Sequence, residues 1–289
     1  MRTNDRRAAA TPATRKQPAA SPAKGETPAA TKATGWTPAA RAAPHDHAGH
    51  AHGPEPLFTS RSRVSSSKRP EVVSQDLASL MPTPRQASVS GPRKLERFTF
   101  EKGVQGPANE YTVTVGNHSV KVTLPVSTQQ GLHNATIEQV TRTLARMPAA
   151  ALREVKEVRV SPSQNPADSF WAKKYNRPDF RSYMTAGREG IVRFYPQPHA
   201  FNEKAAASSI LHETGHVWSY TSRQWKAWDA AAKADGTVVS RYGQSSLGED
   251  VSETTAIYLA TRGTSQFDAY RAIFPNRFAI LDARFGASR

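Results

Sequence analysis

The sequence predicts an α+β domain preceded by a long disordered basic tail. Two observations lead to this prediction. The composition changes near residue 95, and the chain beyond that point combines the period-two pattern of strands with the spacing of amphipathic helices. We therefore place the tail at residues 1–95 and the folded domain at 96–289, with a strand-rich start at 96–125 and a core region at 135–285.

The tail is rich in proline, alanine, threonine and serine. It holds 12 of the 21 prolines of the chain but only two aromatic residues, Trp36 and Phe58. It also carries 15 lysines and arginines against 6 acidic residues, which gives +9 of the net charge of +15. A segment of this composition cannot bury enough apolar surface to offset the entropy that it would lose on ordering. We therefore expect it to be disordered.

A histidine-rich tract lies within the tail. Such a tract can bind zinc, nickel or copper weakly, and could serve as a metal reservoir for another site. The alternative is a flexible polar linker, because no regular structure fixes the imidazoles in a coordinating geometry. The tract is formed by His45, His47, His50 and His52.

Several protein classes do not fit the sequence. The chain has no cysteine, which excludes a disulfide scaffold and any cysteine-based zinc site. No apolar run approaches about 18 residues and no hydrophobic segment follows Met1, so we expect neither a membrane span nor a Sec-type signal peptide. The basic clusters near Arg61 and Lys68 lack interleaved aromatic residues, so we expect no specific nucleic-acid partner.

The first part of the domain is expected to form strands followed by a helix. Apolar and polar residues alternate in segments 98–100 and 111–124, and the second segment contains a turn signal at Gly116. In segment 135–147 the apolar residues recur at helical spacing, so we expect a helix that ends before Pro148.

The next elements are expected to be a strand and a hairpin. Residues 152–160 include valines in a strand-like pattern. Residues 182–195 predict a hairpin that turns at 187–190. Its second arm, 191–195, is expected to lie beside the helix that follows.

The C-terminal part is expected to be helical. Segment 222–234 predicts a helix whose Trp225 and Trp228 are either core residues or the wall of a substrate subsite. Segment 265–285 predicts further helix that is interrupted at Pro275.

A pattern typical of zinc hydrolases lies in the predicted helix 210–220. His212 and His216 are four residues apart, so both imidazoles lie on one helix face and can bind one ion. Glu213 stands beside them, in the H-E-x-x-H order that holds Zn²⁺ and lets the glutamate take a proton from the attacking water. The alternative is a histidine pair that is hydrogen-bonded in a core, with Glu213 as a solvated neighbour.

A hydrolytic zinc site needs a third protein ligand and keeps a fourth position for water. Segment 242–259 predicts a loop followed by a helix that begins near Leu247. Glu249 and Glu253 share one face of that helix, so we assign Glu249 as the ligand and expect Glu253 to hydrogen-bond a ligating histidine. Asp250 points elsewhere and is expected to be a solvated acid of the first turn.

Two further residues bear on this site. Gly215 has no side chain, so we expect it to leave room for another element to approach the helix. His199 lies thirteen residues before His212 and is the alternative to Glu249 as third ligand.

The sequence HETGH, followed by Tyr242, Glu249 and Glu253 in this order, resembles the gluzincin metallopeptidases. It is most similar to the group that contains the catalytic domain of anthrax lethal factor, and the resemblance covers about residues 135–285. It departs from that group in segment 249–255, which is more polar than the phenylalanine- and alanine-rich run of the relatives.

The resemblance implies a zincin-like fold with a small mixed sheet, an active-site helix and one zinc ion per chain. His212, His216 and Glu249 would be the zinc ligands, which makes 135–285 the catalytic core. Glu213 would be the general base, and Tyr242 would donate a hydrogen bond to the oxyanion or a proton to the leaving amine.

In this family an edge strand also receives the peptide substrate by strand addition. The resemblance suggests segment 191–195 for this role, and the alternative is an ordinary packed strand.

We expect a zinc-dependent metalloendopeptidase that acts on a protein or peptide substrate. A basic tail before such a domain suits a secreted or injected toxin-like effector, with the tail contacting secretion or injection machinery. The alternatives are a cytoplasmic location and a non-catalytic binding protein on a zincin scaffold.

Overall fold

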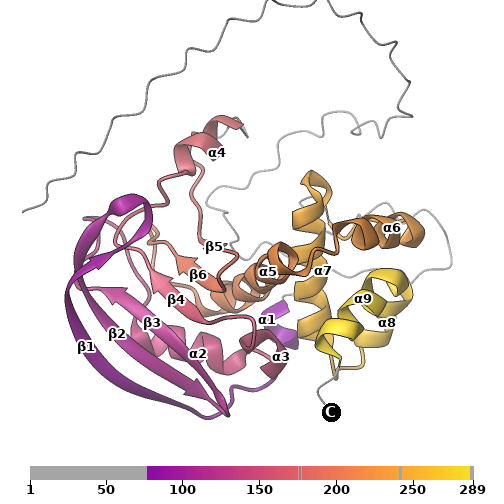
Figure 1. Ribbon diagram of the computed structural model, residues 1–289, viewed down its shortest axis with the longest axis horizontal. Helices are drawn as coiled ribbons and strands as arrows, with labels where there is room; N and C mark the ends of the chain where they lie inside the picture. Colours follow the sequence, from indigo (N-terminus) through magenta and orange to yellow (C-terminus); the bar gives the residue numbers. More distant parts are fainter. Residues whose placement is uncertain (1–76, 175, 177, 241–242, 287–289) are drawn as a thin grey trace, which may run out of the picture. The chain divides into compact units, whose positions relative to one another are not determined.

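The computed structural model describes residues 77–174, 176, 178–240 and 243–286. This part of the chain forms an α+β domain with one six-stranded mixed sheet, in agreement with the predicted class (Figure 1). The strands follow the order β1-β2-β3-β4-β6-β5 across the sheet. Their bounds are β1 Ala87–Thr99, β2 Gln105–Val115, β3 His118–Pro125, β4 Glu157–Val160, β5 Met184–Ala186 and β6 Ile191–Phe194.

The predicted tail boundary at residue 95 is wrong, because helix α1 (Leu77–Leu80) and most of β1 lie before it. Leu77 is buried in the core. The side chains of β1 are mostly exposed, and the strand is held by its antiparallel pairing with β2. Because backbone pairing needs no apolar composition, the average over the tail concealed this strand. The histidine tract lies outside the described residues.

One face of the sheet forms the core. Val122 of β3 pairs with Val158 of β4, which pairs with Val192 of β6, and all three side chains are fully buried. Successive side chains of a strand point to opposite faces, so alternate residues complete this apolar layer. The hairpin predicted in segment 111–124 is confirmed, with Gly116 in its turn at φ 61°.

The predicted strand 152–160 is shorter than expected. Its first residue belongs to a short helix, α3, and β4 starts only at Glu157. The run of three alanines after Pro148 explains the helical turn, because proline suits the start of a helix and alanine is the best helix former.

The hairpin predicted in segment 182–195 is confirmed, but its second arm is not the edge strand. β6 lies between β4 and β5, and β5 forms the edge of the sheet. β6 buries Val192 and Phe194, which suits an interior strand. The sequence could not decide this order, since either arm of a hairpin can join the neighbouring strand.

The helices beyond the hairpin include the predicted ones. Helix α5 begins after Asn202, whose side chain accepts hydrogen bonds from the next turn. Helix α9 begins at Pro275, which confirms the predicted break. None of the helices within the described ranges is long and apolar enough to span a membrane. The residue ranges of the helices after α1 are α2 Ile137–Arg146, α3 Ala149–Leu152, α4 Asp168–Lys174, α5 Glu203–Ser222, α6 Trp225–Asp235, α7 Leu247–Thr261, α8 Phe267–Ile273 and α9 Pro275–Phe285. Two 3-10 turns lie at Glu101–Gly103 and Gly243–Ser245.

Helix α5 is the centre of the domain. It contacts β5 and β6 on one side and α7 on the other, so that the sheet and the C-terminal helices flank it in Figure 1. Gly215 lies where α5 meets α7, and a Cβ atom there would stand only 2.5 Å from Cα of Ser252. The predicted room beside Gly215 is confirmed, since it is occupied by the backbone of α7.

Candidate metal centre

Two helices bring the predicted ligands together. His212 and His216 lie on successive turns of α5, and Glu249 lies in the first turn of α7. The hydroxyl of Ser246 caps α7 by accepting a hydrogen bond from the backbone N–H of Glu249, at 3.2 Å. The third ligand is therefore part of an ordered helix start, packed against the helix that carries the other two.

The three ligand atoms have the spacing that a tetrahedral metal ion requires. Nε2 of His212 lies 3.1 Å from Nε2 of His216 and 3.1 Å from Oε2 of Glu249, and Nε2 of His216 lies 3.4 Å from the same oxygen. A tetrahedral zinc ion with bonds of about 2.0–2.1 Å separates its ligand atoms by about 3.3 Å. The three separations are therefore compatible with one metal ion held between these side chains.

The cluster is largely buried. The side chain of His212 is 1% exposed, whereas those of His216 and Glu249 are 12% and 18% exposed. A hydrolytic site uses three protein ligands, which is the number that this group offers. Across the described ranges, this is the one group of three such side chains that converges. His199 is exposed in a loop and does not belong to it.

The two histidines differ in their protonation. Burial acts to lower the pKa of His216, but the neighbouring carboxylates of Glu249 and Glu213 raise it above its ordinary value. Burial lowers the pKa of His212, which favours the neutral imidazole that metals bind. Burial acts to raise the pKa of Glu249, but the two neighbouring histidines lower it well below its usual range. Glu249 is thus a carboxylate that lies close to both imidazoles.

Glu213 lies beside the ligands and is not one of them. Its side chain is 1% exposed. Burial raises its pKa to about 7, and a hydrogen bond from the backbone N–H of Ala186, at the end of β5, acts in the opposite direction. A carboxylate with this pKa can accept and return a proton near neutral pH.

The predicted hydrogen bond between Glu253 and a ligating histidine is wrong. The carboxylate of Glu253 hydrogen-bonds the hydroxyl of Ser240 and not a histidine. That hydroxyl in turn accepts a hydrogen bond from the backbone N–H of Gly243, at 2.8 Å. Burial and the nearby charge of Glu249 raise the pKa of Glu253 well above its usual range. Glu253 is therefore linked through Ser240 to Gly243, which precedes α7, and not to the histidines.

The prediction that Asp250 is solvated is also wrong, because its side chain is buried. It accepts hydrogen bonds from the indole of Trp228, at 2.7 Å, and from the guanidinium of Arg277, at 2.6 Å. Arg277 follows 27 residues later in the chain, so no local pattern could identify it as the partner.

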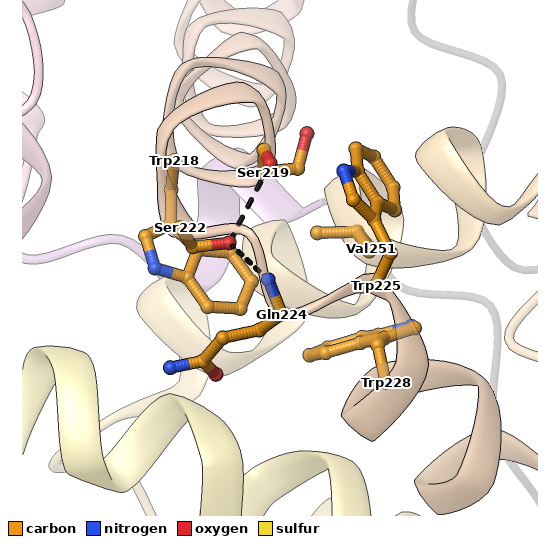
Figure 2. A pocket seen from close by; sticks show the side chains of 7 residues that line it. All are labelled: Trp218, Ser219, Ser222, Gln224, Trp225, Trp228 and Val251. Atoms are coloured by element: carbon orange, nitrogen blue, oxygen red, sulfur yellow. Dashed lines mark hydrogen bonds between the residues drawn. The ribbon is translucent and has the colours of Figure 1, made fainter.

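The tryptophans of α6 belong to the core beside α5 (Figure 2). Trp228 is buried and packs edge-to-face against Trp218, with ring centroids 5.7 Å apart. Together with Trp225 they line a small recess between α5, α6 and α7, and Figure 2 draws the side chains of this lining. These contacts favour the core role for Trp228, whereas Trp225 is only partly buried.

Tyr242 lies outside the described residues, but a second tyrosine lies at the centre. The ring of Tyr220, one turn after His216 on α5, stacks on the imidazole with centroids 6.0 Å apart. Burial and the charges of Glu213 and Glu249 raise the pKa of its phenol, which is thus within electrostatic reach of both carboxylates. The signal in the sequence is its spacing of four residues from His216, which by itself is also typical of a packing residue.

No family model matches the chain, and its comparison with curated proteins and with solved structures likewise gives no match. The assignment of a function therefore depends on the chemistry of these side chains.

Proposed function

We propose that the chain is a zinc-dependent metalloendopeptidase of the gluzincin type, with a zincin-like fold. The observation that carries the proposal is the tetrahedral spacing of His212, His216 and Glu249 next to a buried glutamate whose pKa lies near neutrality. A structural zinc site would have four protein ligands, and a core histidine pair would not need Glu213.

The residues divide the chemistry between them. A zinc ion held by His212, His216 and Glu249 would polarise the scissile carbonyl and activate water. Glu213 accepts the proton of the attacking water and delivers it to the leaving amine. Its burial keeps the carboxylate out of bulk water and raises its pKa to about 7, which suits a group that must both take up and return a proton near neutral pH.

The sheet edge offers a place for the substrate. β5 is the edge strand, and α5 packs beside it. An extended peptide that pairs with β5 would gain backbone hydrogen bonds without any requirement for particular side chains. Because Ala186 of β5 also contacts Glu213, such a peptide would run past the general base.

The basic tail is proposed to mediate secretion or injection of this peptidase. A truncated chain that tests this role should begin at Leu77, because α1 and β1 belong to the domain.

A direct test is hydrolysis of a broad peptide library by the zinc-loaded protein. We expect cleavage that stops on chelation, returns with added zinc and is absent from the Glu213→Gln variant. A zinc-loaded protein that cleaves no member of the library would instead favour a binding protein on the same scaffold.

Replacing Tyr220 with phenylalanine is expected to lower kcat about tenfold. The ring of Tyr220 stacks on His216, so its phenol would donate a hydrogen bond to the oxyanion. Its exposure of 43% makes the expected effect smaller than the roughly 100- to 1,000-fold of a buried donor. Steady-state kinetics on a cleaved peptide measure this, with Tyr242→Phe assayed in parallel because the family resemblance assigns the same role to Tyr242. Unchanged kcat in Tyr220→Phe would make Tyr220 a packing residue of His216.

A further inference from the structure

A buried charge network lies behind the candidate metal centre. Arg277, at the start of α9, is fully buried. Its Nε donates to Asp235 at 2.8 Å, its Nη1 donates to Asp250 at 2.6 Å, and its Nη2 donates to the backbone carbonyl of Thr237 at 2.7 Å. One guanidinium thereby joins α9 to the end of α6 and to the first turn of α7.

The two carboxylates of the network have further partners. Asp235 accepts hydrogen bonds from the backbone N–H and side-chain amide of Asn276, at 2.8 and 2.9 Å. Asp250 accepts one from the indole of Trp228. The guanidinium also lies over the ring of Phe274, 4.7 Å from its centroid. A fork with donors at fixed angles holds its partners in one geometry, which a flexible ammonium does not.

Stability alone is a weak reason for such a network. Removing a guanidinium and two carboxylates from water costs free energy for each group, and well-packed apolar residues of similar volume often stabilise a fold equally well. The network is therefore better explained by the positions in which it fixes α6, α7 and α9.

That geometry matters at the residue next to Asp250. His212 and His216 keep their mutual spacing because they share α5, but Glu249 reaches them from a separate helix. The position of its carboxylate depends on where the first turn of α7 lies. Asp250 is the adjacent residue in that turn, and the network ties it to Trp228 of α6 and to Arg277 of α9.

We infer that Arg277 is a positioning residue that sets the place of the metal ligand Glu249, by anchoring Asp250 and the first turn of α7 to α6 and α9. The inference rests on the proposed metal site and adds to it a determinant of metal affinity that lies outside the ligand set.

The test compares metal binding in two conservative variants of the full chain. Arg277→Lys keeps the charge and loses the fork, and Asp250→Asn keeps the shape and loses the charge. Arg284→Lys is the matched control, because Arg284 lies on the same helix and pairs with Glu154 at 2.5 Å, away from α7. Glu249→Ala gives the background binding of the remaining histidines.

The readouts are the zinc dissociation constant, from competition with a chromophoric chelator, and the visible absorption spectrum of the cobalt(II)-substituted protein. Both are taken at a temperature at which circular dichroism shows every variant to be folded. We expect Arg277→Lys and Asp250→Asn each to bind zinc at least about tenfold more weakly, with an altered cobalt spectrum, since misplaced ligands commonly cost about 10- to 100-fold in affinity. Arg284→Lys should match the wild type.

If either variant is folded and binds both metals as the wild type does, even with a lowered melting temperature, the network is structural only and the inference is overturned. Should Arg277→Lys not fold, Asp250→Asn decides by itself. A wild-type chain that binds no more zinc than Glu249→Ala would overturn the proposed metal site, which is a different result.

Discussion

Replacing Glu213 with glutamine is expected to abolish peptide hydrolysis and to leave zinc bound. Glutamine has the same shape but cannot accept a proton, so the loss should be that of a general base, about 100- to 10,000-fold in kcat. Zinc should remain because Glu213 lies outside the group of converging ligand atoms. The measurements are kcat on a cleaved peptide and zinc content by elemental analysis of the same protein sample.

The control for this variant is Glu203→Gln, which changes the same residue type in the first turn of α5. Glu203 pairs with Arg142 at the surface, far along the helix from the metal ligands, so its variant should keep the wild-type rate. Wild-type activity in Glu213→Gln would show that another group takes the proton. Loss of zinc together with activity would show that Glu213 supports the ligands and not the reaction.

Gly215→Ala is expected to lower the free energy of unfolding by about 1–3 kcal/mol or more, as overpacked cores do. The new methyl group would lie 2.5 Å from Cα and 3.1 Å from the carbonyl oxygen of Ser252. These are backbone atoms, which cannot rotate away, so α5 and α7 must move apart. Because the proposed metal ligands lie on both helices, zinc binding should weaken in the same variant. Urea denaturation and zinc titration measure the two effects.

Gly248→Ala is the matched control, since Gly248 lies on α7 and its nearest neighbouring atom would be 3.6 Å from the new methyl group. Alanine favours a helix by about 0.5–1 kcal/mol over glycine, so this variant should be as stable as the wild type or more so. If Gly215→Ala were as stable as Gly248→Ala, the close approach of α5 and α7 would not limit the residue at this position.

The fold was predictable where its signals are local. The hairpin at Gly116 has a turn residue between alternating strands, and Pro275 separates two helical patterns. The signals failed where pairing is long-range. The composition places most of β1 in the tail, because this strand is stabilised by backbone pairing with β2 and not by apolar side chains. The order of the strands could not be predicted either, since β5 and not β6 lies at the edge of the sheet.

The candidate site shows the same division. The proximity of His212 to His216 could be predicted from the helical repeat. The proximity of Glu249 could be predicted because a hydrolytic zinc site needs a third ligand and Glu249 lies on a predicted helix. The partners of Glu253 and Asp250 could not be predicted, because the residues around a carboxylate in the sequence do not show which distant side chain packs against it. Ser240 and Arg277, which decide both roles, lie on other elements of the chain.

The most direct test of the proposed function is the zinc content of a chain that begins at Leu77, compared with its Glu249→Ala variant. This truncation removes the four histidines of the tail, so any zinc bound with high affinity reports on the site between α5 and α7. We expect one zinc ion per chain in the parent protein, and its loss or a large decrease in affinity in Glu249→Ala. A parent protein that binds no zinc under replete conditions, or a Glu249→Ala variant that binds it equally well, would contradict the three-ligand site.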